Sequence, residues 1–497
     1  MRIPAPPPPR RTSFAGMTTG WLEMKSSSSL YLLLLGILLL GLFLRIGAAI
    51  RFPNTFHADE IFQTQEPAHR LAYGYGIITW EWRRGVRSWV YPAFLAGGMR
   101  ATAWMGTGSE GYVRGIAIVL SLLSLTTIWF GFAWAKRASG TEAAIIAAGA
   151  CAAWYELVYF GPKTLTEIMA TNALLPGLYL GMYGEGLGEK RRMLLAGVFC
   201  GLAMSIRIQL APAVGFAALY FWYPNRRQRT LPLAVGLLLP VLGFGLVDMI
   251  TWAHPFQSYI NYIRANLYEG RRGYGVSPWY WYLEMLCVHL GPIAFLVLMG
   301  LRRSPFLGWV SLIILLTHNY FGHKEVRFLY PMVPLEITLA ALGIMELMPA
   351  FNARRKKPLS SRVIVAGGLA FCVVSSCLLI QQFDWSRNSG NLAAFDRLSR
   401  DPTLCGVAVY GIGWYDLGGY AHLHKNVPIL ILKSPSEFED QSQSFNAFIT
   451  PGNLGGNLHG FEMAGCSGGV CVYRRQGPCT QPRADNEINW VLWLNGS

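Results

Sequence analysis

The chain has 497 residues, of which 53% are hydrophobic and only 14% are charged. Soluble domains carry charge on roughly a quarter of their residues, so this composition excludes an ordinary soluble protein. The net charge of +15 is carried largely by short basic clusters between apolar stretches. Such loops mark the cytoplasmic side of a membrane protein and argue against nucleic acid as a partner.

The sequence predicts a disordered cytoplasmic tail over 1–28, which contains APPPPRR, followed by a membrane domain over 29–380. The first span, 30–50, has the length of a transmembrane helix and no A-x-A-like cleavage site after it, so we expect it to be retained. Further apolar segments lie at 88–106, 112–135, 141–160, 165–185, 193–223, 231–252, 279–299, 305–321, 329–349 and 361–380.

These segments predict an all-α polytopic membrane protein with about ten to thirteen transmembrane or re-entrant helices. Arg207 interrupts segment 193–223 and predicts two short helices that meet at a polar bend. The number of membrane crossings can be counted forward from a cytoplasmic N-terminus or backward from the basic cluster at 354–357. The two counts disagree by one crossing in the region 88–136. Placing 88–106 in the membrane as a re-entrant or interfacial helix reconciles the two counts.

The loop at 51–87 is the expected catalytic loop. It begins with HADE, in which Asp59 and Glu60 follow directly on an apolar span, where an acid is costly and calls for a reason. Asp59, Glu66 and Arg70 fall on one stripe of a helix, which Pro67 is expected to kink. The sequence leaves two readings open: the acids complement a helix N-terminus, or one of them is a general base at the membrane surface.

Later in the same loop, TWEWRRGVR interleaves aromatic and charged side chains. Trp80 and Trp82 are typical of an aromatic belt at the lipid headgroups. With Glu81 and Arg87 between and after them, they also suit a sugar-binding cleft. The sequence does not decide between these two interpretations.

HKEVRF, at 323–328, lies between two spans in a loop that the crossing count places outside. His323, Lys324 and Arg327 are potential cations there, against the positive-inside tendency. We expect them to meet an anionic phosphate, with snorkelling of the long side chains as the alternative. Arg207 falls on the same face. The sequence shows no metal-ligand cluster.

Residues 381–497 have a different sequence pattern, in which short apolar runs alternate with glycine-rich turns. This pattern predicts a small extracytoplasmic α/β or β domain. Four of the nine cysteines lie there: Cys405, Cys466, Cys471 and Cys479. Disulfides in an oxidising compartment are the expected use, and three pairings are possible.

HADE, TWEW and HKEVRF, in this order and spacing, resemble the motifs of the dolichyl-phosphate-mannose-dependent mannosyltransferases of the GT-C superfamily. GGYAHLHKNVPI, at 418–429, is similar to the branch that builds glycosylphosphatidylinositol (GPI) anchors. The family usually has proline where this chain has Ala58. The resemblance implies a multi-pass protein of the bacterial inner membrane or the endoplasmic reticulum membrane, with its active site on the non-cytoplasmic side.

The resemblance further implies inverting transfer of a hexose, expected to be mannose, from a polyprenyl-phosphate donor to a lipid-linked glycan or other glycoconjugate, with no cofactor. Asp59 is the expected base and Glu60 a second or acceptor-orienting acid. The cations of HKEVRF are expected to hold the donor phosphate. Residues expected to contact substrate are His57, Trp80, Glu81, Trp82, Arg87 and Arg207. A transporter or flippase of lipid-linked sugars is the alternative function.

Overall fold

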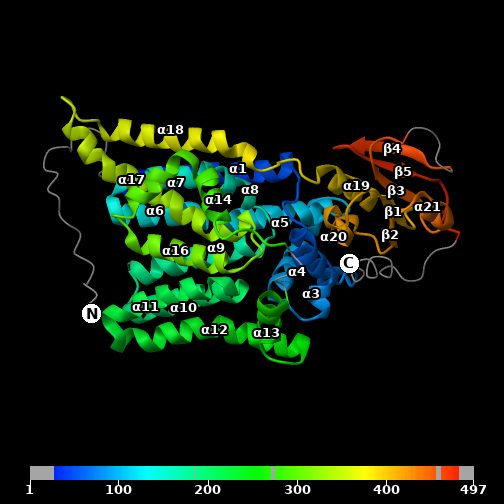
Figure 1. Cartoon of the computed structure of the whole chain (residues 1–497), viewed down its shortest axis with the longest axis horizontal. Helices are drawn as coiled ribbons and strands as arrows, with labels where there is room; N and C mark the ends of the chain where they lie inside the picture. The colour runs from blue at the N-terminus through cyan, green and yellow to red at the C-terminus, as the bar shows by residue number, and fades with distance from the viewer. Residues whose placement is uncertain (1–26, 185, 270–274, 455–459, 481–497) are drawn as a thin grey trace.

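The computed structural model describes residues 27–184, 186–269, 275–454 and 460–480. Almost all of the expected tail 1–28, and the end of the chain from 481, lie outside the described residues. Helices of residues 27–382 form an elongated bundle, and residues 389–480 form a smaller body at one end of it (Figure 1). The apolar segments become helices because a helix satisfies its own backbone hydrogen bonds within lipid.

The bundle contains α1 (Ser27–Arg51), α2 (Glu66–Tyr73), α3 (Trp80–Arg83), α4 (Val90–Thr102), α5 (Glu110–Leu123), α6 (Thr126–Ser139), α7 (Thr141–Ala153), α8 (Tyr155–Phe160), α9 (Thr166–Met182), α10 (Glu189–Ile206), α11 (Ala211–Trp222), α12 (Arg226–Trp252), α13 (Gln257–Ile263), α14 (Trp281–Leu290), α15 (Ala294–Gly300), α16 (Pro305–Tyr320), α17 (Val333–Ala353) and α18 (Ser361–Leu379). Within the described residues, six helical stretches are long and apolar enough to cross a membrane: Ser29–Arg51, Glu110–Ser139, Ile208–Trp252, Trp281–Gly300, Val326–Ala353 and Ser361–Gln382. The predicted all-α polytopic membrane domain is confirmed.

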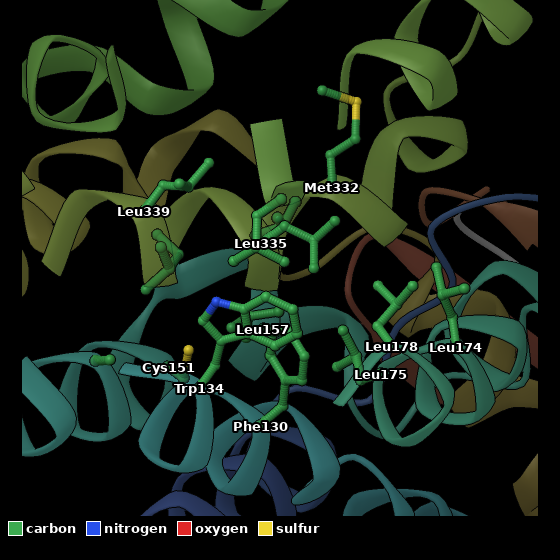
Figure 2. Packing of buried hydrophobic residues seen from close by; sticks show 14 of the residues in the cluster. Phe130, Trp134, Cys151, Leu157, Leu174, Leu175, Leu178, Met332, Leu335 and Leu339 are labelled. Atoms are coloured by element: carbon green, nitrogen blue, oxygen red, sulfur yellow. The ribbon is translucent and has the colours of Figure 1, made fainter. Parts of the chain in front are cut away.

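The centre of the bundle is an apolar core to which α6, α8, α9 and α17 contribute (Figure 2). Phe130 and Trp134 of α6 and Leu157 of α8 are completely buried, as is Leu335 of α17. Close helix approach depends on small residues, as is common in membranes. A Cβ atom at Gly343 of α17 would collide with the backbone of α15, so only glycine fits there.

Segment 193–223 bends at Arg207, as predicted. α10 ends at Ile206, and a short 3-10 turn leads into α11. The extended backbone at Arg207 (φ −135°, ψ 95°) turns its side chain into the bundle, where it is buried beside Glu167.

Both ends of α4 lie on the side of the bundle that carries the α/β domain. Before α4, the carbonyl of Arg87 accepts a hydrogen bond from Trp252, at the end of α12. After α4, the backbone N–H of Ser109 donates to Ser399 of the α/β domain. A helix of 13 residues with both ends on one side does not cross the bundle. The predicted re-entrant or interfacial position of this helix in a membrane stays a prediction.

The predicted single stripe over 59–70 is wrong, because Glu60–Gln65 form a π-helix before α2 begins. Hydrogen bonds in a π-helix run from i to i+5, so the turn is wider and Asp59 and Glu66 no longer share a face. Glu66 instead turns toward the α/β domain, where its carboxylate accepts hydrogen bonds from the backbone N–H of Ile77 (2.7 Å) and Ala421 (2.6 Å).

The C-terminal body is a five-stranded sheet of order β2-β1-β3-β5-β4. The strands β2, β1 and β3 are parallel, and β5 pairs antiparallel with both β3 and β4. Its elements are α19 (Ser389–Ser399), β1 (Val407–Tyr410), α20 (Gly419–Leu423), β2 (Ile429–Leu432), α21 (Pro435–Gln441), β3 (Ala447–Pro451), β4 (Glu462–Ser467) and β5 (Val470–Arg474). Parallel pairing requires crossovers, which α20 and α21 supply, so the domain is α/β.

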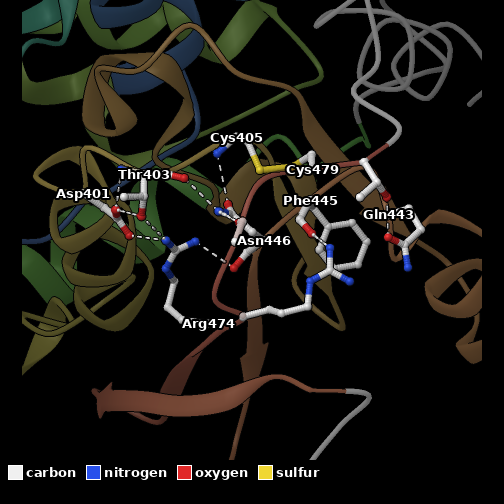
Figure 3. Close-up of a disulfide and its surroundings, with 11 residues drawn as sticks. Asp401, Thr403, Cys405, Gln443, Phe445, Asn446, Arg474 and Cys479 are labelled. Atoms are coloured by element: carbon white, nitrogen blue, oxygen red, sulfur yellow. Dashed lines mark hydrogen bonds and ion pairs between the residues drawn. A yellow bond between two sulfur atoms is a disulfide. The ribbon is translucent and has the colours of Figure 1, made fainter.

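Two disulfides join the four cysteines of this domain. Cys405 pairs with Cys479, with the Cα atoms 5.9 Å apart, and Cys466 pairs with Cys471 between β4 and β5. Asn446 holds the first bridge in place (Figure 3), since its side chain accepts from the backbone N–H of Cys405 at 3.0 Å. The sequence left three pairings open, and the structure selects one.

Candidate active site

A cavity of about 510 Å³ lies where the bundle meets the α/β domain. Stretches far apart in the sequence form its walls: the 57–63 loop, 79–87, the bend between α10 and α11, the end of α13, 323–328, the linker at 387, and a turn after β1. The lining residues are His57, Ala58, Asp59, Phe62, Gln63, Thr79, Trp80, Glu81, Arg87, Arg207, Tyr262, Ala265, Asn266, His323, Glu325, Arg327, Phe328, Arg387, Trp414 and Tyr415. Eight of the residues singled out in the sequence line this one cavity: His57, Asp59, Trp80, Glu81, Arg87, Arg207, His323 and Arg327.

The central contact of the cavity joins Asp59 to Arg327. Asp59 is the N-terminal flanking residue of the π-helix, and Arg327 lies on the 3-10 helix Val326–Met332 that leads into α17. Although 268 positions separate them, Nη2 of Arg327 donates to Oδ2 of Asp59 at 2.5 Å. The fold therefore brings HADE and HKEVRF, the two strongest motifs, into direct contact.

Arg327 is 2% exposed and binds two further carboxylates. Its Nε and Nη2 atoms donate to Glu325 at 2.7 and 2.9 Å. Its Nη1 atom lies 3.4 Å from Glu167, which also pairs with Arg207 at 3.2 Å. Three carboxylates thus fix two guanidinium groups at the cavity wall, and a buried charge stays ionised only with such partners.

The network sets the ionisation of the two acids that flank Arg327. Burial alone would raise the pKa of Asp59, but the charge of Arg327 and the hydrogen bond from His57 outweigh it and hold that pKa well below its usual range. The pKa of Glu325 is lowered in the same way, against burial, chiefly by the charge of Arg327. Both shifts favour the ionised form of these carboxylates, which is the form that accepts a proton.

Two histidines complete this wall. The Nδ1 atom of His57 lies 3.3 Å from Oδ1 of Asp59, and Nε2 of His323 lies 2.9 Å from Oε1 of Glu325. Burial lowers the pKa of His57, but the hydrogen bond to Asp59 and its charge outweigh burial, so the pKa lies above its ordinary value. The raised pKa favours the protonated, cationic form of His57 beside Asp59.

The fold also assembles a group that the sequence did not suggest. His57, Asp59 and Glu325 each offer a ligand atom within 4.8 Å of the others, although the sequence shows no metal-ligand cluster. Both carboxylates already bind the guanidinium of Arg327 at 2.5 to 2.9 Å. A divalent cation would share these carboxylates with the permanent positive charge of Arg327, which already contacts Oδ2 of Asp59 and both oxygens of Glu325.

Glu81, Arg87 and Trp80 also line the cavity. Oε1 of Glu81 accepts from Nη2 of Arg87 at 2.7 Å, from Nε of Arg87 at 3.1 Å and from Gln63 at 3.4 Å. Burial raises the pKa of Glu81, and the nearby charge of Asp59 adds to this, against the charge of Arg87. Polar groups beside an indole suit a sugar, because the ring covers C–H surface while the polar groups bind hydroxyls.

Three predicted site residues do not line the cavity. Glu60 faces away from Asp59, accepts from the backbone N–H of Phe56 at 2.5 Å and lies 3.5 Å from buried Lys163. Trp82 is 2% exposed and donates to a backbone carbonyl. The ammonium of Lys324 donates to the backbone carbonyls of Asn319, in the last turn of α16, and Phe321, just after it.

Among the residues of the site and its network that sequence reasoning missed are Glu167, Glu325, Arg387, Trp414 and Tyr415. Two of these had a readable signal. Glu325 lies inside HKEVRF among the cations, and Glu167 is an acid at the start of an apolar span, where a partner is required. The other three reach the cavity only through tertiary folding.

Comparison with solved structures defines the class of protein. ArnT from Cupriavidus metallidurans, in a structure bound to undecaprenyl phosphate, superposes with a TM-score of 0.62. The match has 11% identity and covers 92% of this chain and 100% of that chain, so it shows a shared fold. The protein is a multi-pass membrane glycosyltransferase with the GT-C fold.

Comparison of sequences identifies the family. The Alg9-like mannosyltransferase family matches residues 36–424, and the chain belongs to it. It is similar to GPI mannosyltransferase 3 of Yarrowia lipolytica, with 27% identity covering 78% of this chain and 75% of the relative. It is also similar to GPI alpha-1,2-mannosyltransferase 3 of Mus musculus, with 25% identity covering 82% of this chain and 75% of the relative.

Proposed function

We propose that the enzyme transfers mannose, with inversion, from a polyprenyl-phosphate mannose to a GPI-type glycolipid at the non-cytoplasmic membrane face. The observation that carries the proposal is the contact of Asp59 with Arg327 in one open cavity. A base and a buried guanidinium are the two groups that this reaction needs. The names of the relatives, GPI mannosyltransferase 3 and GPI alpha-1,2-mannosyltransferase 3, support the GPI acceptor and an alpha-1,2 linkage.

In the proposed reaction, the acceptor hydroxyl attacks C1 of the mannose from the side opposite the phosphate. Asp59 takes the hydroxyl proton as the new C–O bond forms, a role that contributes roughly 10²–10⁴-fold in rate. The bond from C1 to the phosphate oxygen breaks, and the polyprenyl phosphate leaves with the electron pair. An alpha-linked product formed with inversion requires a donor in which mannose is beta-linked to phosphate.

Arg327 stabilises the leaving phosphate, and His323 and Arg207 line the same cavity as Arg327. A phosphate anion leaves without being protonated, so no general acid is needed. The phosphate also competes with Asp59 for the N–H groups of Arg327. Donor binding therefore loosens the 2.5 Å pair and raises the basicity of Asp59 at the moment when a base is required.

A lipid donor with one phosphate fits this cavity better than a nucleotide sugar. One guanidinium cluster offers charge for one phosphate, and ArnT, which shares the fold, has been solved with undecaprenyl phosphate bound. The diphosphate of a nucleotide sugar usually meets a glycine-rich cradle or a metal held by paired acids.

The distribution of basic residues supports the non-cytoplasmic face. The loop between α15 and α16 carries Arg303, which pairs with Glu346 near the end of α17 and with Ser139 at the end of α6. The cavity lies at the other end of the bundle, beside the α/β domain (Figure 1). The positive-inside rule assigns the arginine-rich end to the cytoplasm.

Reconstitution separates transfer from the alternative of lipid-sugar transport. Liposomes containing the protein and labelled polyprenyl-phosphate mannose should form labelled glycolipid, and Asp59→Asn should abolish this while inserting normally. Movement of the label across the bilayer without product formation, unchanged in Asp59→Asn, would establish the flippase instead.

A further inference from the structure

One turn of the α/β domain contributes to the lining of the cavity. Among the described residues that line it, those from this domain are Trp414 and Tyr415. They lie on the 3-10 turn Trp414–Asp416, just beyond the carboxyl end of β1, the place where open α/β sheets commonly bind ligands.

The turn is anchored on both sides. Val409 of β1 before it and Leu417 after it are both fully buried in the domain core. The ring of Trp414 packs on Phe62 with the centroids 5.5 Å apart, and Phe62 follows Asp59 in the π-helix. The turn is thus held against the helix that carries the base.

Tyr415 remains 50% exposed at the mouth of the cavity. A Cβ atom on Gly413 would come within 2.7 Å of its ring, so the glycine leaves room for the tyrosine to fold back over the turn. An ordered aromatic ring half open to solvent, beside a wall of charged and polar groups, matches the apolar-plus-polar lining of carbohydrate and other small-ligand sites.

The charges determine which substrate this ring faces. Of the described residues that line the cavity, Arg327, His323, Arg207 and Arg87 are cations of the membrane bundle, and Arg387 is a cation of the linker before the α/β domain. The proposed reaction places the donor phosphate with Arg327, His323 and Arg207. Inversion requires the acceptor to approach from the side opposite that phosphate. Among the described lining residues, those of the α/β domain are the aromatic side chains Trp414 and Tyr415, and neither is a cation.

We propose that Trp414 and Tyr415 form the acceptor subsite, in which they pack against the pyranose ring of the terminal hexose of the glycan acceptor. The inference rests on the proposed glycosyl transfer and extends it, because it makes the α/β domain the part that selects the acceptor. The membrane bundle then handles the donor, and the two tasks meet at Asp59.

The test measures the Michaelis constants for donor and acceptor separately in purified Tyr415→Ala and Trp414→Ala proteins. Removal of one aromatic packing partner should raise the acceptor KM about tenfold and leave the donor KM unchanged. Tyr415→Phe keeps the ring and should stay within about twofold of wild type. Trp104→Ala removes an 82% exposed tryptophan that does not line the cavity and is the matched control.

Trp414→Ala loses its packing on Phe62 and is informative only if it folds, so Tyr415→Ala decides the question. An unchanged acceptor KM in Tyr415→Ala, or a donor KM that rises as much as the acceptor KM, overturns the subsite. A wild-type protein that transfers nothing from polyprenyl-phosphate mannose overturns the proposed function itself. The two failures are therefore distinguishable.

Discussion

Replacing Arg327 with lysine tests the proposed phosphate site most sharply. The guanidinium makes four contacts with three carboxylates: 2.5 Å to Asp59, 2.7 and 2.9 Å to Glu325, and 3.4 Å to Glu167. Truncation to alanine would remove the cation that the three carboxylates share, and breaking a buried ion pair in this way costs about 3–5 kcal/mol in stability. Lysine keeps the charge but loses the planar fork.

A single ammonium group cannot satisfy the carboxylates and the donor phosphate at once. Loss of one charge-assisted hydrogen bond costs about 1.5–3 kcal/mol, which corresponds to a fall of about 10- to 100-fold in kcat/KM for the donor. The acceptor KM should not change. Arg303→Lys is the control, because Arg303 is paired with Glu346 at 2.8 Å at the opposite end of the bundle.

The assay varies polyprenyl-phosphate mannose at saturating acceptor, and then the acceptor at saturating donor, with the protein in detergent. The reasoning fails if Arg327→Lys leaves donor kinetics intact and raises the acceptor KM. It also fails if Arg303→Lys, which has no contact with the cavity, reduces donor kcat/KM equally.

Three further predictions follow from other contacts. Asp59→Asn should lower transfer at least about 100-fold with normal membrane insertion, whereas full activity there and loss in Glu60→Gln would reverse the two roles. His69, with a pKa lowered to about 4 by burial and by the nearby His424, binds its proton more readily when unfolded. Docking of the α/β domain should therefore weaken as pH falls from about 6.5 to 4, by up to about 3 kcal/mol, and His69→Asn should flatten this dependence in limited proteolysis. The four cysteines of the α/β domain should resist maleimide until a reductant is added, and labelling of the untreated protein would contradict both bridges.

Much of the fold could be predicted because lipid imposes a simple rule on the sequence. The long apolar segments predicted the helices, and the polar interruption at Arg207 predicted the bend between α10 and α11. The π-helix at Glu60–Gln65 could not be predicted, because its wider turn is selected by tertiary contacts and not by apolar periodicity. The predicted stripe through Asp59 and Glu66 failed for that reason.

The candidate site could be predicted where one motif carried both its charge and its position, as with Asp59 and Arg327. The site could not be predicted where a residue next to a site residue in the sequence points away from the cavity. Glu60, next to Asp59, points toward Lys163, and Lys324 donates to a carbonyl of its own loop. Adjacent residues point in different directions, and only packing decides which of them reaches the cavity.

The most direct test of the account compares two donors. Purified protein, with a mannose-terminated glycolipid acceptor and no other enzyme, receives either short-chain polyprenyl-phosphate mannose or GDP-mannose. The account predicts product from the lipid donor, loss of that product in Asp59→Asn, and none from GDP-mannose. Transfer from GDP-mannose in the absence of any lipid carrier would contradict the central claim that the cavity of Asp59 and Arg327 works on a lipid phosphate.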